Sequence, residues 1–176
     1  EIYGAHNLPG FAFGQVYTRT GTFACGSEGM TLKFHGKTTH AAYPENGLSP
    51  AHAVGELLRQ VPEFLTPEHD TGMVLCTVIG VQMGEKAFGA AAADAEVWLT
   101  LRAEHEKDLE LLRETVWRTA KDLAEADGLG VEMEEQDVFP ATENDPGCAA
   151  KVMERCNGKP LEVPMRWSED FGHYLK

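Results

Sequence analysis

The first strongly patterned segment of the chain has the two-residue period of a β-strand. Residues 30–35 read Met-Thr-Leu-Lys-Phe-His, so Met30, Leu32 and Phe34 share one face. Such alternation of apolar and polar residues is typical of a strand with one buried face. The pattern therefore predicts a half-buried strand that ends at Gly36.

Two other segments have the period of amphipathic helices. Ser49 and Pro50 supply a cap and a first-turn proline. Apolar residues then follow at helical spacing up to the region of Pro67, namely Val54, Leu57, Leu58, Val61 and Leu65. A second stripe begins after Glu106 and ends before Gly128, and it comprises Leu109, Leu112, Val116, Ala120 and Leu123. We expect one helix over each segment.

Three further segments are rich in β-branched and apolar residues. Residues 73–81 and 96–103 are expected to pair across the connection 84–94, and residues 131–136 provide a fourth strand. The order of elements is then β-α-β-β-α-β. This order is typical of a ferredoxin-like sandwich, in which two helices cover one face of a four-stranded antiparallel sheet. We therefore expect an α+β domain over residues 23–136.

Composition adds limits to this picture but no function. The net charge of -13 argues against binding to a nucleic acid backbone, which needs a surplus of lysine and arginine. The four cysteines lack both Cys-x-x-Cys spacing and the density of a secreted disulfide scaffold, and the sequence contains no apolar run of membrane-helix length. We expect a cytoplasmic protein with no nucleic acid or membrane partner. Because Glu1 already leads into a strand, we also expect the chain to begin inside a larger protein.

His6 is the first residue whose context suggests chemistry. It stands between a short apolar run and an Asn-x-Pro-Gly turn, where a strand ends and its side chain can face a cleft. That position suits a metal ligand, and it also suits a histidine that is merely hydrogen-bonded beside a turn. His6 is therefore a candidate metal ligand.

Several short motifs occur in a fixed order along the chain. They are Gly4-Ala5-His6-Asn7 with Pro9-Gly10, Gly36-x-x-x-His40-Ala41-Ala42-x-Pro44, Ser49-Pro50, Phe88 ahead of Thr100-Leu101-Arg102, and Ser168-Glu169-Asp170-Phe171. Together they resemble the M20 family of metal-dependent peptidases and amidohydrolases, especially the branch that hydrolyses N-acyl amino acids and hippurate.

The resemblance implies how the chain is divided. In the family, a ferredoxin-like lid or dimerisation domain is inserted into an α/β zinc-peptidase-like catalytic domain. Residues 23–136 would form the lid domain, and residues 1–22 and 137–176 would be pieces of a catalytic domain present only in part. A homodimer formed through the lid domain is implied as well.

The resemblance also implies a reaction. Two divalent metal ions, zinc or manganese, polarise an amide carbonyl and activate a water, a glutamate takes the proton of that water, and a donor stabilises the oxyanion. The implied substrate is an N-acyl amino acid or a small peptide-like amide. By this mapping the glutamate and most metal ligands precede the position of Glu1 and the last histidine ligand follows that of Lys176, which leaves His6 as the ligand within this chain.

Three more residues receive roles from the resemblance. His40 matches a histidine that reaches from the lid, often into the partner subunit's site, and donates to the substrate carbonyl. Arg102 matches an arginine that binds a substrate carboxylate or helps to fix the transition state, and its alternative role is a salt bridge at the sheet edge. Gly89 replaces a substrate-binding asparagine, because residues 89–93 read Gly-Ala-Ala-Ala-Ala where the family has Asn-Val-Ile-Pro-Asp. Either a backbone amide substitutes for that side chain or the substrate preference has changed.

The end of the chain and the function as a whole each have alternatives. Ser168 is expected to cap a terminal helix, although Glu169, Asp170 and His173 have a spacing that could form a metal cluster. For the whole chain we expect part of a metal-dependent amidohydrolase that is inactive by itself, because the general base lies outside it. The alternatives are a non-catalytic oligomerisation or small-molecule-binding module and a metal-binding relative that has lost activity.

Overall fold

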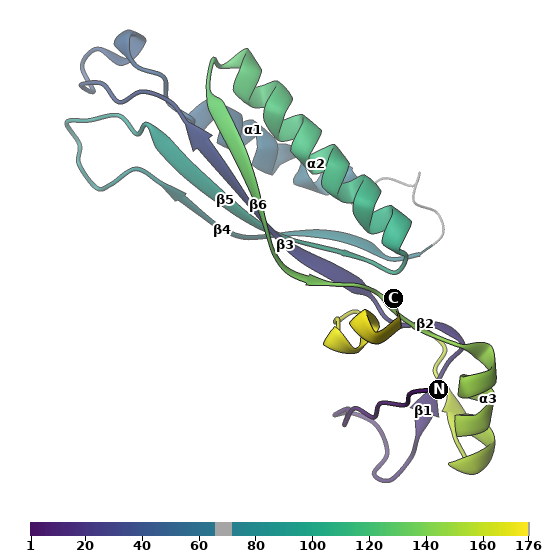
Figure 1. The fold of residues 1–176 in the computed structure, drawn as a ribbon. Coiled ribbons are helices and arrows are strands. Elements are labelled where there is room, and N and C mark those ends of the chain that lie inside the picture. Colours follow the sequence, from purple (N-terminus) through teal and green to yellow (C-terminus); the bar gives the residue numbers. More distant parts are fainter. Residues whose placement is uncertain (66–71, 176) are drawn as a thin grey trace.

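A four-stranded antiparallel sheet organises the chain (Figure 1). The computed structural model describes residues 1–65 and 72–175, so Pro67 lies outside the described residues. The strands are β3 (Gly26–His35), β4 (Val74–Met83), β5 (Asp94–Ala103) and β6 (Gly130–Phe139), in the spatial order β4-β5-β3-β6. All neighbouring strands are antiparallel. This arrangement confirms the predicted four-stranded sheet, with strands somewhat longer than their apolar patterns indicate.

Two helices pack on one face of the sheet, as predicted. They are α1 (Ala51–Gln60) and α2 (Glu106–Ala126). The first helix is shorter than expected, because residues Val61–Leu65 form a separate 3₁₀ helix, η2. Pro62 accounts for the difference, since proline has no backbone N–H to continue the α-helical hydrogen bonds.

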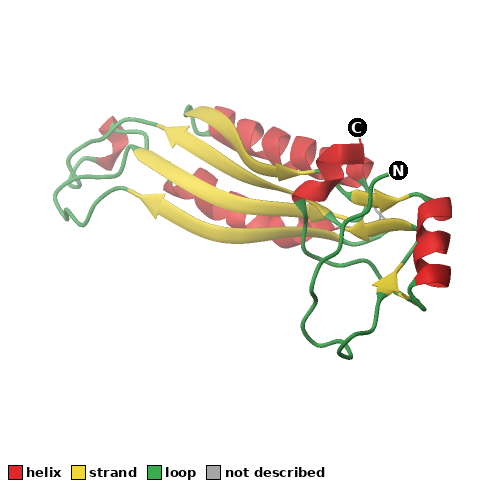
Figure 2. Ribbon diagram, turned by 60° about the horizontal axis from the view of Figure 1, so that its bottom comes forward, coloured by secondary structure: helices red, strands yellow, loops and turns green. Residues whose placement is uncertain are grey.

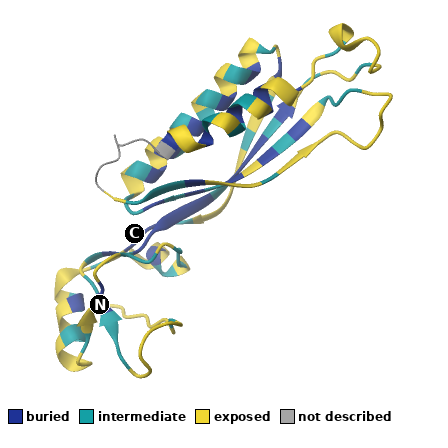
Figure 3. Ribbon diagram, turned by 180° about the vertical axis from the view of Figure 1, so that it is seen from behind, coloured by how far each residue is buried: buried dark blue, intermediate teal, exposed yellow. Residues whose placement is uncertain are grey.

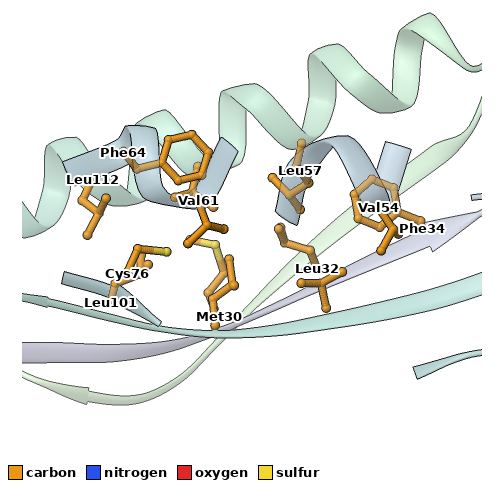
Figure 4. Packing of buried hydrophobic residues seen from close by; sticks show 14 of the residues in the cluster. Met30, Leu32, Phe34, Val54, Leu57, Val61, Phe64, Cys76, Leu101 and Leu112 are labelled. Atoms are coloured by element: carbon orange, nitrogen blue, oxygen red, sulfur yellow. The ribbon is translucent and has the colours of Figure 1, made fainter. Parts of the chain in front are cut away.

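The core lies between the sheet and these helices (Figure 4). Met30, Leu32 and Phe34, which the alternation places on one face, are all 1% exposed or less. They meet Leu57 of α1 and Leu112 of α2 in one hydrophobic cluster. Burial of each such side chain contributes about 2 kcal/mol. The apolar faces of α1 and α2 therefore pack against the apolar face of β3, as the sequence patterns predict.

The four short strands that remain lie beyond one end of the sheet (Figure 2). The parallel pair is β1 (Tyr17–Thr18) with β8 (Lys159–Pro160), and the antiparallel pair is β2 (Gly21–Ala24) with β7 (Thr142–Asn144). These pairs bring the beginning and the end of the chain together in space.

A third helix, α3 (Pro146–Arg155), follows β7. Asp145 caps it by accepting a 2.9 Å hydrogen bond from the Cys148 backbone N–H, and Pro146 occupies its first turn. The chain closes with the 3₁₀ helix η4 (Asp170–Leu175). Within residues 1–65 and 72–175, the helices are all too short or too polar to cross a membrane.

Candidate active-site residues

The four predicted site residues fall into two clusters at opposite ends of the sheet. Figure 1 shows the two ends, with the loops after β3 and before β5 at one end and the N-terminal segment beyond the other. Strand β5 begins at Asp94, which pairs with His35, and ends at Ala103, which pairs with Gly26. With a rise of about 3.3 Å per residue, these ends are roughly 30 Å apart. His40 and Gly89 lie in loops at the Asp94 end, which we call the distal end. His6 and Arg102 lie at the Ala103 end, which we call the proximal end.

At the distal end, the loops that follow β3 and precede β5 are joined by backbone hydrogen bonds. His40 forms a bridge with Ala90, and the Ala41 N–H donates to the Gly89 carbonyl over 3.0 Å. The Ala42 N–H also donates to His40 Nδ1 over 3.1 Å. Because Nδ1 accepts this bond, the ring proton belongs on Nε2, which makes the exposed face of His40 a hydrogen-bond donor.

A second connection at the distal end fixes the base of the His40 loop. Lys37 and Leu48 exchange backbone hydrogen bonds of 2.9 and 2.8 Å, and the 3₁₀ helix η1 (Pro44–Asn46) fills the loop between them. Gly36 allows this approach, because a Cβ atom there would lie 2.1 Å from the Leu48 carbonyl oxygen. The glycine of the Gly36-x-x-x-His40 motif is therefore required by packing.

At the proximal end, His6 is paired with a carboxylate. Its Nε2 lies 2.8 Å from Glu169 Oε1, and its Nδ1 lies 3.0 Å from the backbone oxygen of Asn7. The Trp167 ring packs beside the imidazole, with the two ring centroids 5.0 Å apart. Both His6 and Glu169 line a cleft of about 1410 Å³ between the N-terminal segment, α3 and η4.

Arg102 contacts the same C-terminal segment. Its Nη1 donates to Ser168 Oγ over 3.3 Å and to the Arg166 carbonyl oxygen over 3.4 Å. Ser168 Oγ also lies 2.6 Å from Ser27 Oγ of β3. The predicted capping role of Ser168 is therefore wrong, because the terminal helix begins only at Asp170 and the Ser168 hydroxyl bonds to the sheet.

The described residues form no complete metal site. No three of their His, Cys, Asp and Glu side chains are grouped closely enough to hold a metal ion, so the alternative cluster of Glu169, Asp170 and His173 is not formed. His6 is an imidazole, a ligand type that zinc takes, and Glu169 is the carboxylate beside it. The His6 side chain therefore fits a metal site that further residues would complete. No local pattern indicates this pairing, because the two residues lie near opposite ends of the chain.

A comparison with protein families identifies the central region. The family model of the peptidase dimerisation domain, M20_dimer, matches residues 24–128, which is more than half of the chain. The chain belongs to the M20 peptidase family. This membership confirms the resemblance and the expected type of sheet domain.

Curated relatives align over nearly the whole chain. An N-acetyldiaminopimelate deacetylase of Streptococcus thermophilus is 27% identical over 99% of this chain, and a hippurate hydrolase of Campylobacter jejuni is 23% identical over 99%. In both cases the chain spans 48% of the relative's length. The M20 chain described here therefore corresponds to about half of these enzymes.

Solved structures share the fold. One is a dinuclear metal-binding peptidase of the M20 family from Bacillus subtilis, with a TM-score of 0.73, 18% identity, and coverage of 97% of this chain and 43% of that one. Another is an aminobenzoyl-glutamate utilization protein from Klebsiella pneumoniae, with a TM-score of 0.72, 16% identity, and coverage of 87% and 41%. At these identities the likeness concerns the fold.

Proposed function

We propose that this M20 chain is part of a metal-dependent hydrolase that cleaves the amide bond of N-acyl amino acids or small peptide-like substrates. The observation that carries the proposal is the alignment with a deacetylase over 99% of the chain, which includes the segments that flank the dimerisation domain as well as the domain itself. Those flanking segments contain His6 and Glu169.

The proposed division assigns residues 23–136 to a lid domain and residues 1–22 and 137–176 to a catalytic domain. The pairings of β1 with β8 and of β2 with β7 support it, because they join the two flanking segments to each other. The large side chains of Ile2, Tyr3 and Phe13 in the first segment are exposed. In Figure 3 most of the loop in this segment has the colour of exposed residues. Apolar exposure of this kind is typical of a surface that packs against further polypeptide.

His6 is the proposed ligand of one of two divalent ions, zinc or manganese, with the remaining ligands supplied by the rest of the full-length protein. When bound, such an ion supplies an activated water and polarises the amide carbonyl. The dinuclear metal-binding peptidase of Bacillus subtilis, which shares the fold, supports a centre with two metal ions. Gly89 lies in the loop joined to that of His40, and an added Cβ there would meet no atom within 4 Å. We therefore propose that this loop leaves room for the acyl part of a substrate.

Arg102 and His40 are the proposed donors to the substrate. A guanidinium carries five N–H donors, so Arg102 can hold the segment at Ser168 and bind a substrate carboxylate at the same time. His40 presents Nε2–H, as an oxyanion donor requires. The length of the sheet separates His40 from His6 of the same copy, so the proposed partner of His40 is the metal site of a second copy.

The surface proposed for this dimer is the edge strand β4. Val78, Val81 and Met83 pair in register with Leu99, Val97 and Ala95, which are buried on the helix side of the sheet. The three β4 side chains therefore face the helix layer, yet they are 38%, 40% and 42% exposed because the helices leave this edge uncovered. A two-fold axis beside β4 would cover the same apolar strip in both copies.

We expect Val81→Lys to produce monomers. Placing two lysines close to each other in an apolar strip costs several kcal/mol, whereas the folded monomer tolerates a lysine at this exposed position. Light scattering coupled to gel filtration of the full-length protein measures the change, and amide hydrolysis is expected to fall with it because His40 loses its partner site. Val138→Lys, at an exposed position on the opposite edge strand, is the matched control. Monomers from both variants, or dimers from both, would contradict the placement of the interface.

The test of function is hydrolysis of N-acetyl and N-benzoyl amino acids by the full-length protein, with and without added zinc or manganese. We expect metal-dependent turnover that His6→Ala abolishes, because removal of one imidazole opens the metal site. His173→Ala is the matched control, since His173 is an exposed histidine in the neighbouring η4 and belongs to no metal group formed by described residues.

The outcomes separate this function from its alternatives. Tight metal binding without turnover would identify a relative that has lost activity. The replacement of the family motif at residues 89–93 is the reason to consider this alternative. Neither metal binding nor turnover by a folded dimer would identify an oligomerisation or small-molecule-binding module. Equal activity of His6→Ala and the unmutated protein would contradict the role of His6.

A further inference from the structure

Glu169 forms an ion pair with the candidate ligand His6. Oε1 of Glu169 lies 2.8 Å from Nε2 of His6. A contact of this length between an imidazole and a carboxylate is a charge-assisted hydrogen bond, which is stronger and more directional than a neutral one. We propose that Glu169 is a positioning residue that holds the His6 imidazole for metal binding. The inference rests on the proposed function, because it takes His6 to be a metal ligand.

The contact selects which ring nitrogen is available to a metal. A carboxylate oxygen accepts, so Nε2 carries the proton that it donates to Glu169. The nitrogen left for a metal is Nδ1, which lies 3.0 Å from the backbone oxygen of Asn7. That carbonyl oxygen accepts, so a metal ion would take the place of the Nδ1 proton and of this hydrogen bond. The contact of Nε2 with Glu169 would hold the ring in place during the exchange.

Glu169 is itself held in place by the sheet. Met165 forms two backbone hydrogen bonds with residues just before β3. The Cys25 N–H donates to the Met165 carbonyl over 3.0 Å, and the Met165 N–H donates to the Phe23 carbonyl over 2.8 Å. Ser168, the residue before Glu169, bonds to both Ser27 and Arg102. Segment 165–169 is thus held to the sheet region at Met165 and at Ser168, and the Glu169 side chain extends from it to His6.

Trp167 closes the arrangement from a third direction. Its ring packs on His6 with a centroid distance of 5.0 Å and meets Phe23 edge-on at 6.1 Å. The Glu169 side chain is 24% exposed, whereas that of His6 is 50% exposed. The carboxylate is therefore the more fixed member of the pair, and the half-exposed imidazole takes its orientation from the carboxylate.

The test uses the full-length protein and measures zinc affinity by competition with a chromophoric chelator. Loss of an outer-shell partner of a metal-bound histidine typically lowers metal affinity 10–100-fold. We expect a loss in that range for Glu169→Ala, and a smaller loss for Glu169→Gln, because the glutamine amide oxygen still accepts from Nε2. Asp170→Asn, a change of the adjacent carboxylate on the same cleft, is the control and is expected to retain the affinity of the unmutated protein.

A spectroscopic measurement distinguishes positioning from a purely structural role. In the cobalt-substituted protein, reorientation of His6 is expected to change the visible absorption spectrum of Glu169→Ala and to leave that of Asp170→Asn unchanged. An unchanged spectrum and zinc affinity in Glu169→Ala, together with a His6→Ala variant that binds zinc weakly, would overturn this inference alone. Unchanged zinc affinity in His6→Ala would overturn both this inference and the proposed function.

Discussion

Gly36→Ala is expected to destabilise the protein by about 3 kcal/mol, at the upper end of the usual cost of overpacking. The added Cβ would lie 2.1 Å from the Leu48 carbonyl oxygen and 2.9 Å from the side chain of Leu129. The first of these atoms belongs to the backbone, so the clash cannot be relieved by a rotamer change. The two hydrogen bonds between Lys37 and Leu48 must then lengthen or break. Urea unfolding followed by tryptophan fluorescence measures the loss, because Trp98 and Trp117 belong to the sheet domain.

Gly55→Ala is the matched control for this experiment. Gly55 is an exposed residue inside α1, and a Cβ there would meet nothing within 4 Å. Alanine is favoured over glycine in a helix by about 1 kcal/mol, so this change is expected to stabilise. Loss of stability by both variants, or by neither, would show that the close approach at Gly36 is not what restricts that position.

Glu28→Gln is expected to stabilise the protein at alkaline pH by up to about 3 kcal/mol. Glu28 is 2% exposed beneath α2, and its Oε1 has no hydrogen-bond partner among the described residues. Its other oxygen lies 3.7 Å from Arg113 Nη1, which also lies 3.5 Å from Glu135. Burial raises the pKa of Glu28 from 4.5 to about 7, and the Arg113 charge offsets only part of that rise.

The sign of the effect follows from that pKa. Because the folded state holds the Glu28 proton more tightly than the unfolded state, the contribution of Glu28 to stability is fully present below about pH 4.5 and is lost as the pH rises through about 7. Glutamine stays neutral, so the difference in unfolding free energy between variant and unmutated protein is expected to grow between pH 5 and pH 8. Urea unfolding at a series of pH values measures it, with the exposed Glu132→Gln on β6 as the control. A constant difference across this range would contradict a buried, proton-binding Glu28.

The elements of the sheet domain could be predicted because their periodicity is strong and local. The alternation of Met30, Leu32 and Phe34 and the stripe of α2 both gave the correct buried faces. Glu28 lies on the same face of β3, but a carboxylate normally ends an apolar pattern, and nothing in the local sequence indicates that α2 covers it. The flanking strands are only two to four residues long, which is too short for a period to be visible.

The arrangement of the candidate site residues was harder to predict from the sequence than the sheet domain. His6, His40 and Arg102 could be found through motifs, but their separation into two ends of the sheet depends on the strand register, which motifs do not contain. The Asp145-Pro146 pair is a cap followed by a first-turn proline, so α3 had a usable signal. The contact between His6 and Glu169 had none, because it arises from the tertiary pairing of the two chain ends.

Strand β3 connects the two ends of the sheet as one continuous, stiff element. Its ten residues run from Gly26, next to the hydrogen bonds with Met165, to His35, just before the His40 loop. A rotation of about 6° at the Gly26 end of an arm about 30 Å long displaces the far end by about 3 Å, which is the length of a hydrogen bond. The stiffness of the few residues near Cys25 therefore determines how precisely the His40 imidazole, at the other end of the sheet, is positioned relative to the flanking segments.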